Sequence, residues 1–196
     1  QASYGIGFQM GQQLQSNPFD GLAIDAVVAG LKDAFAGQAS QVDNDTLRDA
    51  FGEIHKRMQA AKEEASKAVI EEGTKYLEEN AKRDEVTVTE SGLQYEVIAE
   101  GDGETPVASS TVRVHYHGTL INGSTFDSSY ERGQPAEFPV GGVIKGWTEA
   151  LQLMKVGAKY RLYVPHDLAY GEQGAGAAIA PYSTLIFDVE LLDVLG

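Results

Sequence analysis

Three short segments hold the side chains best suited to chemistry in this chain. Phe126 and Asp127 come first, the run Gly141-Gly-Val-Ile-Lys-Gly-Trp147 follows, and Leu168-Ala-Tyr-Gly171 comes last. Their aromatic and aliphatic residues would form a dry pocket in which one carboxylate and one phenol supply the only fixed polarity. No nucleophile or general base is evident among them. The segments therefore point to a reaction that needs neither.

Rotation about an X-Pro peptide bond is the leading candidate for such a reaction. Resonance holds the bond planar, its cis and trans forms differ by about 0.5–1 kcal/mol, and the barrier is about 18–20 kcal/mol. Twisting the bond abolishes the resonance, so the planar amide is more polar than the twisted transition state. A dry pocket then penalises the ground state more, and each difference of about 1.4 kcal/mol is tenfold in rate. A hydrogen-bond donor to the substrate carbonyl or to the prolyl nitrogen would add to this effect.

Five motifs in order resemble the FKBP-type peptidyl-prolyl cis-trans isomerases over residues 93–194. They are Val114-His-Tyr-His-Gly-Thr-Leu120, Phe126-Asp-Ser-Ser129, Val143-Ile-Lys-Gly-Trp147, Ala169-Tyr-Gly171 and Leu185-Ile-Phe-Asp-Val-Glu-Leu-Leu192. The resemblance implies that the catalytic residues are Asp127, Tyr170, Phe126 and Trp147. It implies that the substrate is bound by Tyr116, Arg132, Phe138, Val143, Ile144, Ile179 and Phe187.

The resemblance also assigns individual roles. Trp147 is the floor of the pocket, Arg132 pairs with Asp127 and Tyr116, and the backbone N–H of Ile144 contacts the carbonyl of a bound peptide or macrolide. Without the resemblance, Tyr116, Val143 and Phe187 would each be interpreted as core residues, and Asp127 could equally be a turn residue.

Three alanines depart from the fullest pattern of that family. Ala136 stands where an aromatic wall residue is often found, and Ala175 and Ala178 stand where the family often carries a His and an Ile. Rapamycin and tacrolimus are expected to bind the pocket, and these departures bear on how strongly they do so. They also bear on the preference for the residue before proline.

Composition divides the 196 residues into a helical first part and a sheet-rich second part. A net charge of −14 argues against nucleic acid as a partner, because phosphate binding needs a basic patch. The absence of cysteine excludes disulfides and thiol catalysis. No apolar stretch reaches the roughly 20 residues of a transmembrane helix. We expect a cytoplasmic protein, or a periplasmic one if a leader was removed before Gln1.

The first part predicts three helices. One contains Tyr4 to Leu14, and a second presents Ile24, Val27, Val28, Leu31 and Phe35 on one face before Gly37. The third begins at the Asp43 and Asn44 cap and runs to about Arg83, a rod of roughly 60 Å. Its large apolar residues lie at its beginning, so its middle is expected to be solvated.

These apolar faces are explained either by an ordinary helical core or by a second copy of the segment. Ala2-Ser-Tyr-Gly-Ile-Gly7 and Tyr76-Leu-Glu-Glu-Asn-Ala81 resemble the dimerising region of bacterial FKBPs of the macrophage-infectivity-potentiator type. That resemblance implies a V-shaped homodimer with an interface of Tyr4, Phe8, Leu31, Leu47, Phe51, Ile54 and Met58.

The predicted fold class is α+β. Residues 1–42 are dimerisation helices, residues 43–83 a long connecting helix, and residues 84–196 an isomerase domain with an antiparallel sheet wrapped around one short helix. Strands are expected at 86–89, 93–99, 112–120, 125–127, 136–139, 159–164 and 185–194. The short helix is expected at 147–154.

Competing signals are weaker. His115 and His117 share one face of a strand and could chelate a metal, but no further ligand is evident, so we expect no metal and no cofactor. The glycines from Gly171 to Gly176 lack the Lys-Ser/Thr of a nucleotide loop, and Ser128 and Ser129 lack a nucleophile elbow.

Two functions remain. The first is an isomerase that accelerates protein folding, with chaperone-like binding of proline-containing unfolded or partly folded proteins by the dimer. The second is a holdase chaperone that binds proline segments with little catalysis.

Overall fold

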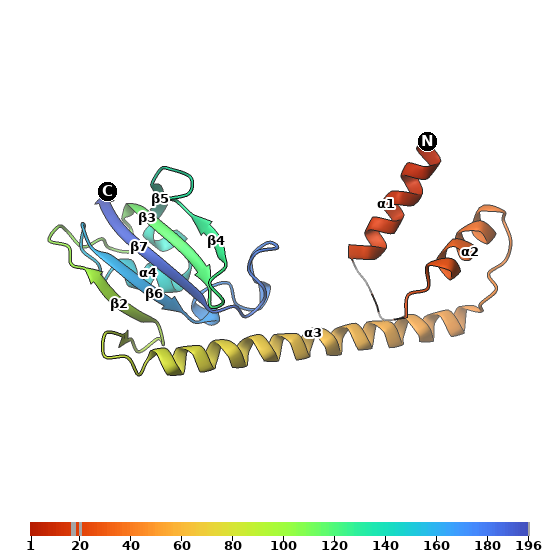
Figure 1. The fold of residues 1–196 in the computed structure, drawn as a ribbon, viewed down its shortest axis with the longest axis horizontal. Helices are drawn as coiled ribbons and strands as arrows, with labels where there is room; N and C mark the ends of the chain where they lie inside the picture. Colours follow the sequence, from red (N-terminus) through yellow and green to blue (C-terminus); the bar gives the residue numbers. More distant parts are fainter. Residues whose placement is uncertain (17–18, 20, 196) are drawn as a thin grey trace. The chain divides into compact units, whose positions relative to one another are not determined.

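The computed structural model of the chain describes residues 1–16, 19 and 21–195, and it divides into two compact units, residues 1–64 and 65–196. Helix α3 (Asn44–Asn80) begins in the first unit and ends in the second (Figure 1). None of the described helices is both long and apolar enough to cross a membrane.

The first unit contains α1 (Ala2–Ser16), α2 (Ile24–Phe35) and the beginning of α3. Gly37 follows α2 with a φ of 69°, a conformation that glycine adopts without strain. Asp43 caps α3, because its carboxylate accepts hydrogen bonds from the backbone N–H of Thr46 at 2.8 Å and from the Thr46 hydroxyl at 2.6 Å. These bonds lower the pKa of Asp43. The predicted start of the long helix is therefore confirmed.

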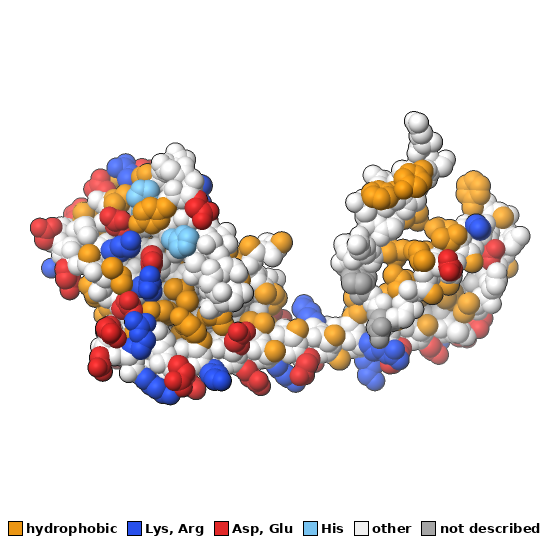
Figure 2. Space-filling model, viewed as in Figure 1, with side chains coloured by type: hydrophobic (Ala, Val, Ile, Leu, Met, Phe, Trp, Pro, Cys, Tyr) orange, Lys and Arg blue, Asp and Glu red, His pale blue; other side chains and the backbone are white. Residues whose placement is uncertain are grey.

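The apolar side chains of the first unit are mostly uncovered. None of the described residues of α1 or α2 is buried, and Tyr4 is 77% and Phe35 97% exposed. Figure 2 shows hydrophobic side chains on the surface of both helices. The exposed set in this unit comprises Tyr4, Ile6, Phe8, Met10, Ile24, Val28, Leu31, Phe35, Val42, Phe51 and Met58. The three helices thus lack a core of their own within one chain.

The second unit is built on an antiparallel sheet. Its strands are β1 (Thr87–Val88), β2 (Gln94–Ala99), β3 (Thr111–Leu120), β4 (Thr125–Ser128), β5 (Ala136–Pro139), β6 (Lys159–Val164) and β7 (Leu185–Val194). They pair in the order β1-β2-β6-β7-β3-β4, and β5 also pairs with β3. With α4 (Lys145–Leu151) covering one face, this arrangement confirms the predicted α+β class (Figure 1).

The core lies between that face and α4. Alternate residues of β3 and β7 are buried, as the period of two in a half-buried strand requires. The fully buried side chains include Leu93, Val114, Leu151, Leu162 and Leu191. The opposite face of the sheet, which α4 does not cover, is called the outer face.

Two helix boundaries differ from those expected. Helix α4 spans Lys145–Leu151 instead of 147–154, because the N–H groups of Trp147 and Thr148 both donate to the carbonyl of Ile144 at 3.0 Å. Helix α3 ends at Asn80 instead of Arg83. There the Asn80 side chain donates to Gln94 at 2.9 Å and accepts from Arg83 at 3.0 Å, and the chain turns toward the sheet.

The last turns of α3 are fastened to the sheet. The Gln94 side chain donates to the carbonyl of Leu77 at 2.9 Å, and the guanidinium of Arg83 pairs with Glu96 at 2.8 Å. Asn80, Gln94 and Glu96 are buried. Because buried polar groups left unpaired cost free energy, these contacts make the end of α3 part of the sheet unit.

Candidate proline-binding pocket

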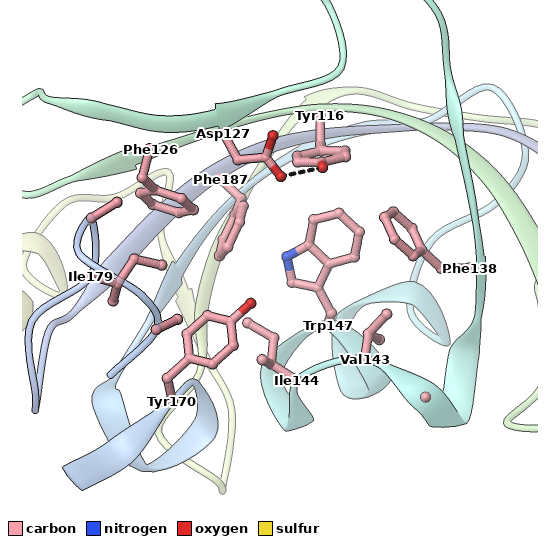
Figure 3. A pocket seen from close by; sticks show the side chains of 13 residues that line it. Tyr116, Phe126, Asp127, Phe138, Val143, Ile144, Trp147, Tyr170, Ile179 and Phe187 are labelled. Carbon is pink, nitrogen blue, oxygen red and sulfur yellow. Dashed lines mark hydrogen bonds between the residues drawn. The ribbon is translucent and has the colours of Figure 1, made fainter. Parts of the chain in front are cut away.

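A cavity of about 650 Å³ opens between α4, the sheet and the segment before β7. Aromatic and aliphatic side chains dominate its lining (Figure 3). The lining residues are Tyr116, Phe126, Asp127, Phe138, Gly142, Val143, Ile144, Trp147, Tyr170, Ala175, Ala178, Ile179 and Phe187.

Trp147 is the centre of the pocket. It lies on α4, is 4% exposed, and has three aromatic rings around it at steep angles. The ring centroids of Tyr116, Phe138 and Phe187 lie 5.3, 5.8 and 5.2 Å from the indole, with interplanar angles of 84°, 89° and 78°. Edge-to-face packing of this kind is the favoured arrangement of aromatic pairs. The pocket floor is therefore closely packed and, apart from the buried indole N–H of Trp147, apolar.

Phe126 completes the wall on the side of β4. Its ring meets that of Phe187 edge to face at 5.4 Å and 87°. A Cβ atom at Gly118 would come within 2.6 Å of the Phe126 ring and 3.0 Å of the Phe187 ring. Only glycine at this place in β3 lets both rings pack against the strand.

Gly118 is a site residue that the sequence interpretation did not single out. The signal was present, because a glycine inside a strand often marks a close approach of another group.

The polar side of the pocket is a closed network of three residues. The Tyr116 hydroxyl donates to Asp127 Oδ2 at 2.5 Å, Arg132 Nη2 donates to the Tyr116 hydroxyl at 2.8 Å, and Arg132 Nη1 pairs with Asp127 Oδ1. The guanidinium also lies 5.4 Å from the centre of the Tyr116 ring. These bonds are the ones that the sequence resemblance implied for Arg132.

This network keeps Asp127 ionised. Burial acts to raise the pKa of Asp127, but hydrogen bonds from Tyr116 and Arg132, together with the charge of Arg132, outweigh it and lower that pKa. Burial and the bond to Asp127 raise the pKa of Tyr116, so its phenol stays protonated. Because both carboxylate oxygens are already bonded, Asp127 is poorly placed to act as a general base.

Several hydrogen-bond donors of the pocket have no partner in the described part of the chain, the buried indole N–H of Trp147 among them. Among the described residues, neither the Tyr170 hydroxyl nor the backbone N–H of Ile144 makes a hydrogen bond. Tyr170 is 42% exposed, and Figure 3 shows its hydroxyl end directed toward the middle of the pocket. A bound peptide could therefore receive two hydrogen bonds at the rim of an otherwise apolar cavity.

The segment before β7 supplies the remaining wall. The backbones of Ala175 and Ile179 exchange hydrogen bonds of 2.9 and 3.1 Å, which close a small loop over the pocket. Ala175, Ala178 and Ile179 face the cavity, and Ile179 is buried. Ala136 packs against the core but does not line the cavity.

The structure thus brings ten of the predicted catalytic and substrate-binding residues to one cavity. The eleventh, Arg132, does not line the cavity but pairs with Asp127. No group of three or more His, Cys, Asp or Glu side chains suited to holding a metal occurs among the described residues. His115 and His117 lie on the outer face of β3 and contribute nothing to the cavity.

Comparison with known proteins gives two family matches. The family described as FKBP-type peptidyl-prolyl cis-trans isomerase matches residues 102–192, and the domain amino terminal to FKBP-type peptidyl-prolyl isomerase matches residues 1–97. The FKBP-type 22 kDa peptidyl-prolyl cis-trans isomerase of Escherichia coli (strain K12) is 55% identical over 195 residues, covering 100% of this chain and 95% of its own length.

Two further proteins are similar over almost the whole chain. The outer membrane protein MIP of Legionella longbeachae is 38% identical and covers 98% of this chain and 84% of its own length. The crystal structure of FkpA from Escherichia coli matches with a TM-score of 0.76 and 39% identity, covering 98% of this chain and 94% of that one.

Proposed function

The chain belongs to the FKBP-type peptidyl-prolyl cis-trans isomerases, and we propose that it rotates X-Pro bonds in the pocket around Trp147 and acts on its clients as a homodimer. The low polarity of the lining residues supports this pocket as the place of the reaction. Asp127, the one carboxylate among the described lining residues, is already bonded to Tyr116 and Arg132. Apart from the Tyr170 hydroxyl and the Trp147 indole N–H, the other lining side chains are apolar. Such a site suits a reaction that forms no covalent bond with the enzyme.

The mechanism follows from the polarity of the amide. The prolyl ring rests on Trp147, beside the contacting rings of Phe126 and Phe187, and the dry walls disfavour the polar planar amide more than the twisted one. The N–H of Ile144 and the hydroxyl of Tyr170 hold the peptide at the rim, so the bond rotates while its flanks stay fixed. Asp127 serves as a fixed negative charge at the mouth.

The homodimer is proposed from the exposed apolar side chains of the first unit. Tyr4, Phe8, Leu31, Phe51 and Met58 are all exposed in one chain, and a surface of this kind normally binds a partner. In a twofold-symmetric dimer, the same surface of each copy contacts the other copy, so a second chain could cover these side chains. Leu47 and Ile54, which are half-buried, extend the same set along α3.

Dimerisation would join two pockets in one molecule. A client held at one site raises the effective concentration of its other proline segments at the second, without any new catalytic contact. We therefore propose that the dimer binds unfolded or partly folded clients in addition to rotating their prolyl bonds. The second candidate function, a holdase with little catalysis, predicts client binding alone.

Macrolide binding is a further proposal for the same pocket. Rapamycin and tacrolimus carry a ring that can take the place of the prolyl ring on Trp147. Ala175 and Ala178 give such a ligand only methyl contacts on the loop side, so we expect measurable but weakened inhibition.

A refolding assay separates these roles. The client is a protein whose slow folding phase is set by a native cis-proline, and the full chain is compared with two of its variants. Phe126→Ala removes a pocket wall, and Phe51→Glu places a charge among the exposed apolar residues.

We expect the unaltered chain to accelerate the slow phase. Phe126→Ala should lose the acceleration but still suppress client aggregation, and Phe51→Glu should keep activity on a short peptide but lose most of it on the protein. Equal acceleration by all three proteins would contradict the dimer's role with clients. Aggregation suppression without acceleration by the unaltered chain would favour the holdase.

A further inference from the structure

A second cavity, of about 350 Å³, lies on the outer face of the sheet. It is separate from the cavity around Trp147, which is called the proline pocket. Its floor is a grid of six side chains from three strands, because His117, Asp188 and Arg161 are register partners, as are Thr119, Ile186 and Tyr163. Tyr76 from the last turns of α3 and Arg83 form its wall. All of these residues belong to the sheet unit. The cavity is called the outer-face pocket.

The cations of the outer-face pocket are held in place by carboxylates. Arg161 donates from Nε to Asp188 Oδ1 at 2.5 Å and from Nη2 to Asp188 Oδ2 at 2.9 Å. Arg83 donates from Nη1 to the Tyr163 hydroxyl at 2.8 Å and pairs through Nη2 with Glu96 at 2.8 Å. Figure 2 shows the resulting mixture of basic and acidic side chains on this face of the sheet domain. Both guanidinium groups are therefore fixed before any ligand arrives.

Several donors of this pocket remain unused. Within the described part of the chain, Arg161 Nη1 and the hydroxyls of Tyr76 and Thr119 make no hydrogen bond. Burial raises the pKa of Tyr76, so its phenol remains a donor at neutral pH. A ligand with acceptor oxygens would find three unpaired donors in the lining of one cavity, and the donor on Arg161 is already held in place by Asp188.

The charges limit which ligand fits. Asp188 and Glu96, with Glu85 at 3.9 Å from Arg83, already offset the charges of the two arginines. Only one edge of the Arg161 guanidinium is left. A dianion such as phosphate would bring a second charge close to Asp188, whereas a carboxylate brings one. The volume lies near the lower limit of small-molecule sites, and Ile186 and the Tyr163 ring offer a small apolar surface beside the donors.

We propose that the outer-face pocket binds a single compact carboxylate, with Arg161 Nη1 and the hydroxyls of Tyr76 and Thr119 as its donors. The carboxylate comes either from a small free acid or from the C-terminus of a polypeptide. Binding here is separate from isomerisation, because no residue of the outer-face pocket lines the proline pocket.

The test is an NMR titration of the ¹⁵N-labelled full chain at constant ionic strength. Acetate, a short peptide with a free C-terminus, the same peptide amidated, and inorganic phosphate are added separately. We expect saturable shifts of the Thr119 and Ile186 amides and of Arg161 Nε with acetate or the peptide acid. The amidated peptide should give none, and phosphate should bind more weakly. Preference for acetate or for the peptide acid identifies the source.

A double variant removes two of the three donors and leaves the ion pairs of Arg161 and Arg83 unchanged. Tyr76→Phe with Thr119→Val should weaken carboxylate binding about fivefold or more. Tyr95→Phe is the matched control, because its phenol lies outside the outer-face pocket and should leave the affinity unchanged. If the double variant does not fold, each single variant is measured instead. Shifts that do not saturate, full affinity in the donor variants, or tighter binding of phosphate would each overturn the proposal.

Discussion

Gly73 of α3 and Thr184, the residue before β7, lie so close that a Cβ atom on Gly73 would come 2.5 Å from Thr184 Oγ1. Thr184 is buried and immediately precedes Leu185, which is fully buried in the core. The threonine therefore has little freedom to move away from the helix. Because Gly73 has no side chain, α3 can pack closely against Thr184 at this point.

We expect Gly73→Ala to lower the free energy of unfolding. Alanine gains about 1 kcal/mol of helix propensity, but overpacking a tight contact typically costs about 1–3 kcal/mol. In a Thr184→Ala background the same change should instead stabilise, because the clashing oxygen is gone. Urea unfolding followed by fluorescence of Trp147, the only tryptophan, measures both steps of this double-mutant cycle. An identical effect of Gly73→Ala in both backgrounds would refute the close contact.

The ionised form of Asp127 should stabilise the fold in a pH-dependent way. Its pKa is lowered in the folded chain, since hydrogen bonds from Tyr116 and Arg132 outweigh the effect of burial. The stabilisation is therefore present above the unfolded value of about 4 and is lost as pH falls through the folded-state pKa. Asp127→Asn should be less stable than the unaltered chain at pH 7, and the difference should shrink in acid. Urea midpoints across that range check this, and a constant difference would speak against it.

Tyr182 has a φ of 62°, in the left-handed region that tyrosine rarely adopts. Its ring packs edge to face on His166 at 5.3 Å, and its backbone N–H donates to the carbonyl of Gly171 at 2.8 Å. Replacing the residue by Gly or by Ala removes the same ring contact, but only glycine tolerates this φ without strain. We expect Tyr182→Gly to be more stable than Tyr182→Ala by about 1 kcal/mol, as thermal unfolding can show. The opposite order would indicate an ordinary φ in solution.

Phe51→Glu should convert the proposed dimer into a monomer. Phe51 lies among the exposed apolar residues of the first unit, and an unpaired charge buried in an apolar interface costs several kcal/mol. Ala61→Glu is a suitable control, because Ala61 lies in the exposed middle of α3 and should leave the association unchanged. Sedimentation velocity distinguishes the two species. A Phe51→Glu chain that still sediments as a dimer would place the interface elsewhere.

The sequence predicted the strands of the second unit well because their turns and alternation are local signals. Strands β5, β6 and β7 have the expected bounds, and the Asp43 cap predicted the start of α3. The end of α3 depends on the long-range bond from Asn80 to Gln94, which no local pattern contains.

The five motifs in order contain most of the predicted site residues, and Arg132, Phe138 and Ile179 lie between motifs, where only the resemblance assigns them to the site. The role of Gly118 depends instead on two rings brought together from β4 and β7, and the outer-face pocket depends on the register of three strands. A glycine inside a strand indicates a close approach, but which groups approach it, and which side chains line the outer-face pocket, follow only from tertiary structure.

The most direct test of the account is the rate of cis-trans exchange of a short X-Pro peptide, measured by NMR exchange spectroscopy without a coupled protease. The unaltered chain should accelerate exchange, and Phe126→Ala and Trp147→Ala should each lower kcat/KM by tenfold or more, about 1.4 kcal/mol of transition-state stabilisation. Tyr95→Phe, outside the pocket, should keep the full rate. Full activity in both pocket variants, with their fold intact, would contradict catalysis at this site.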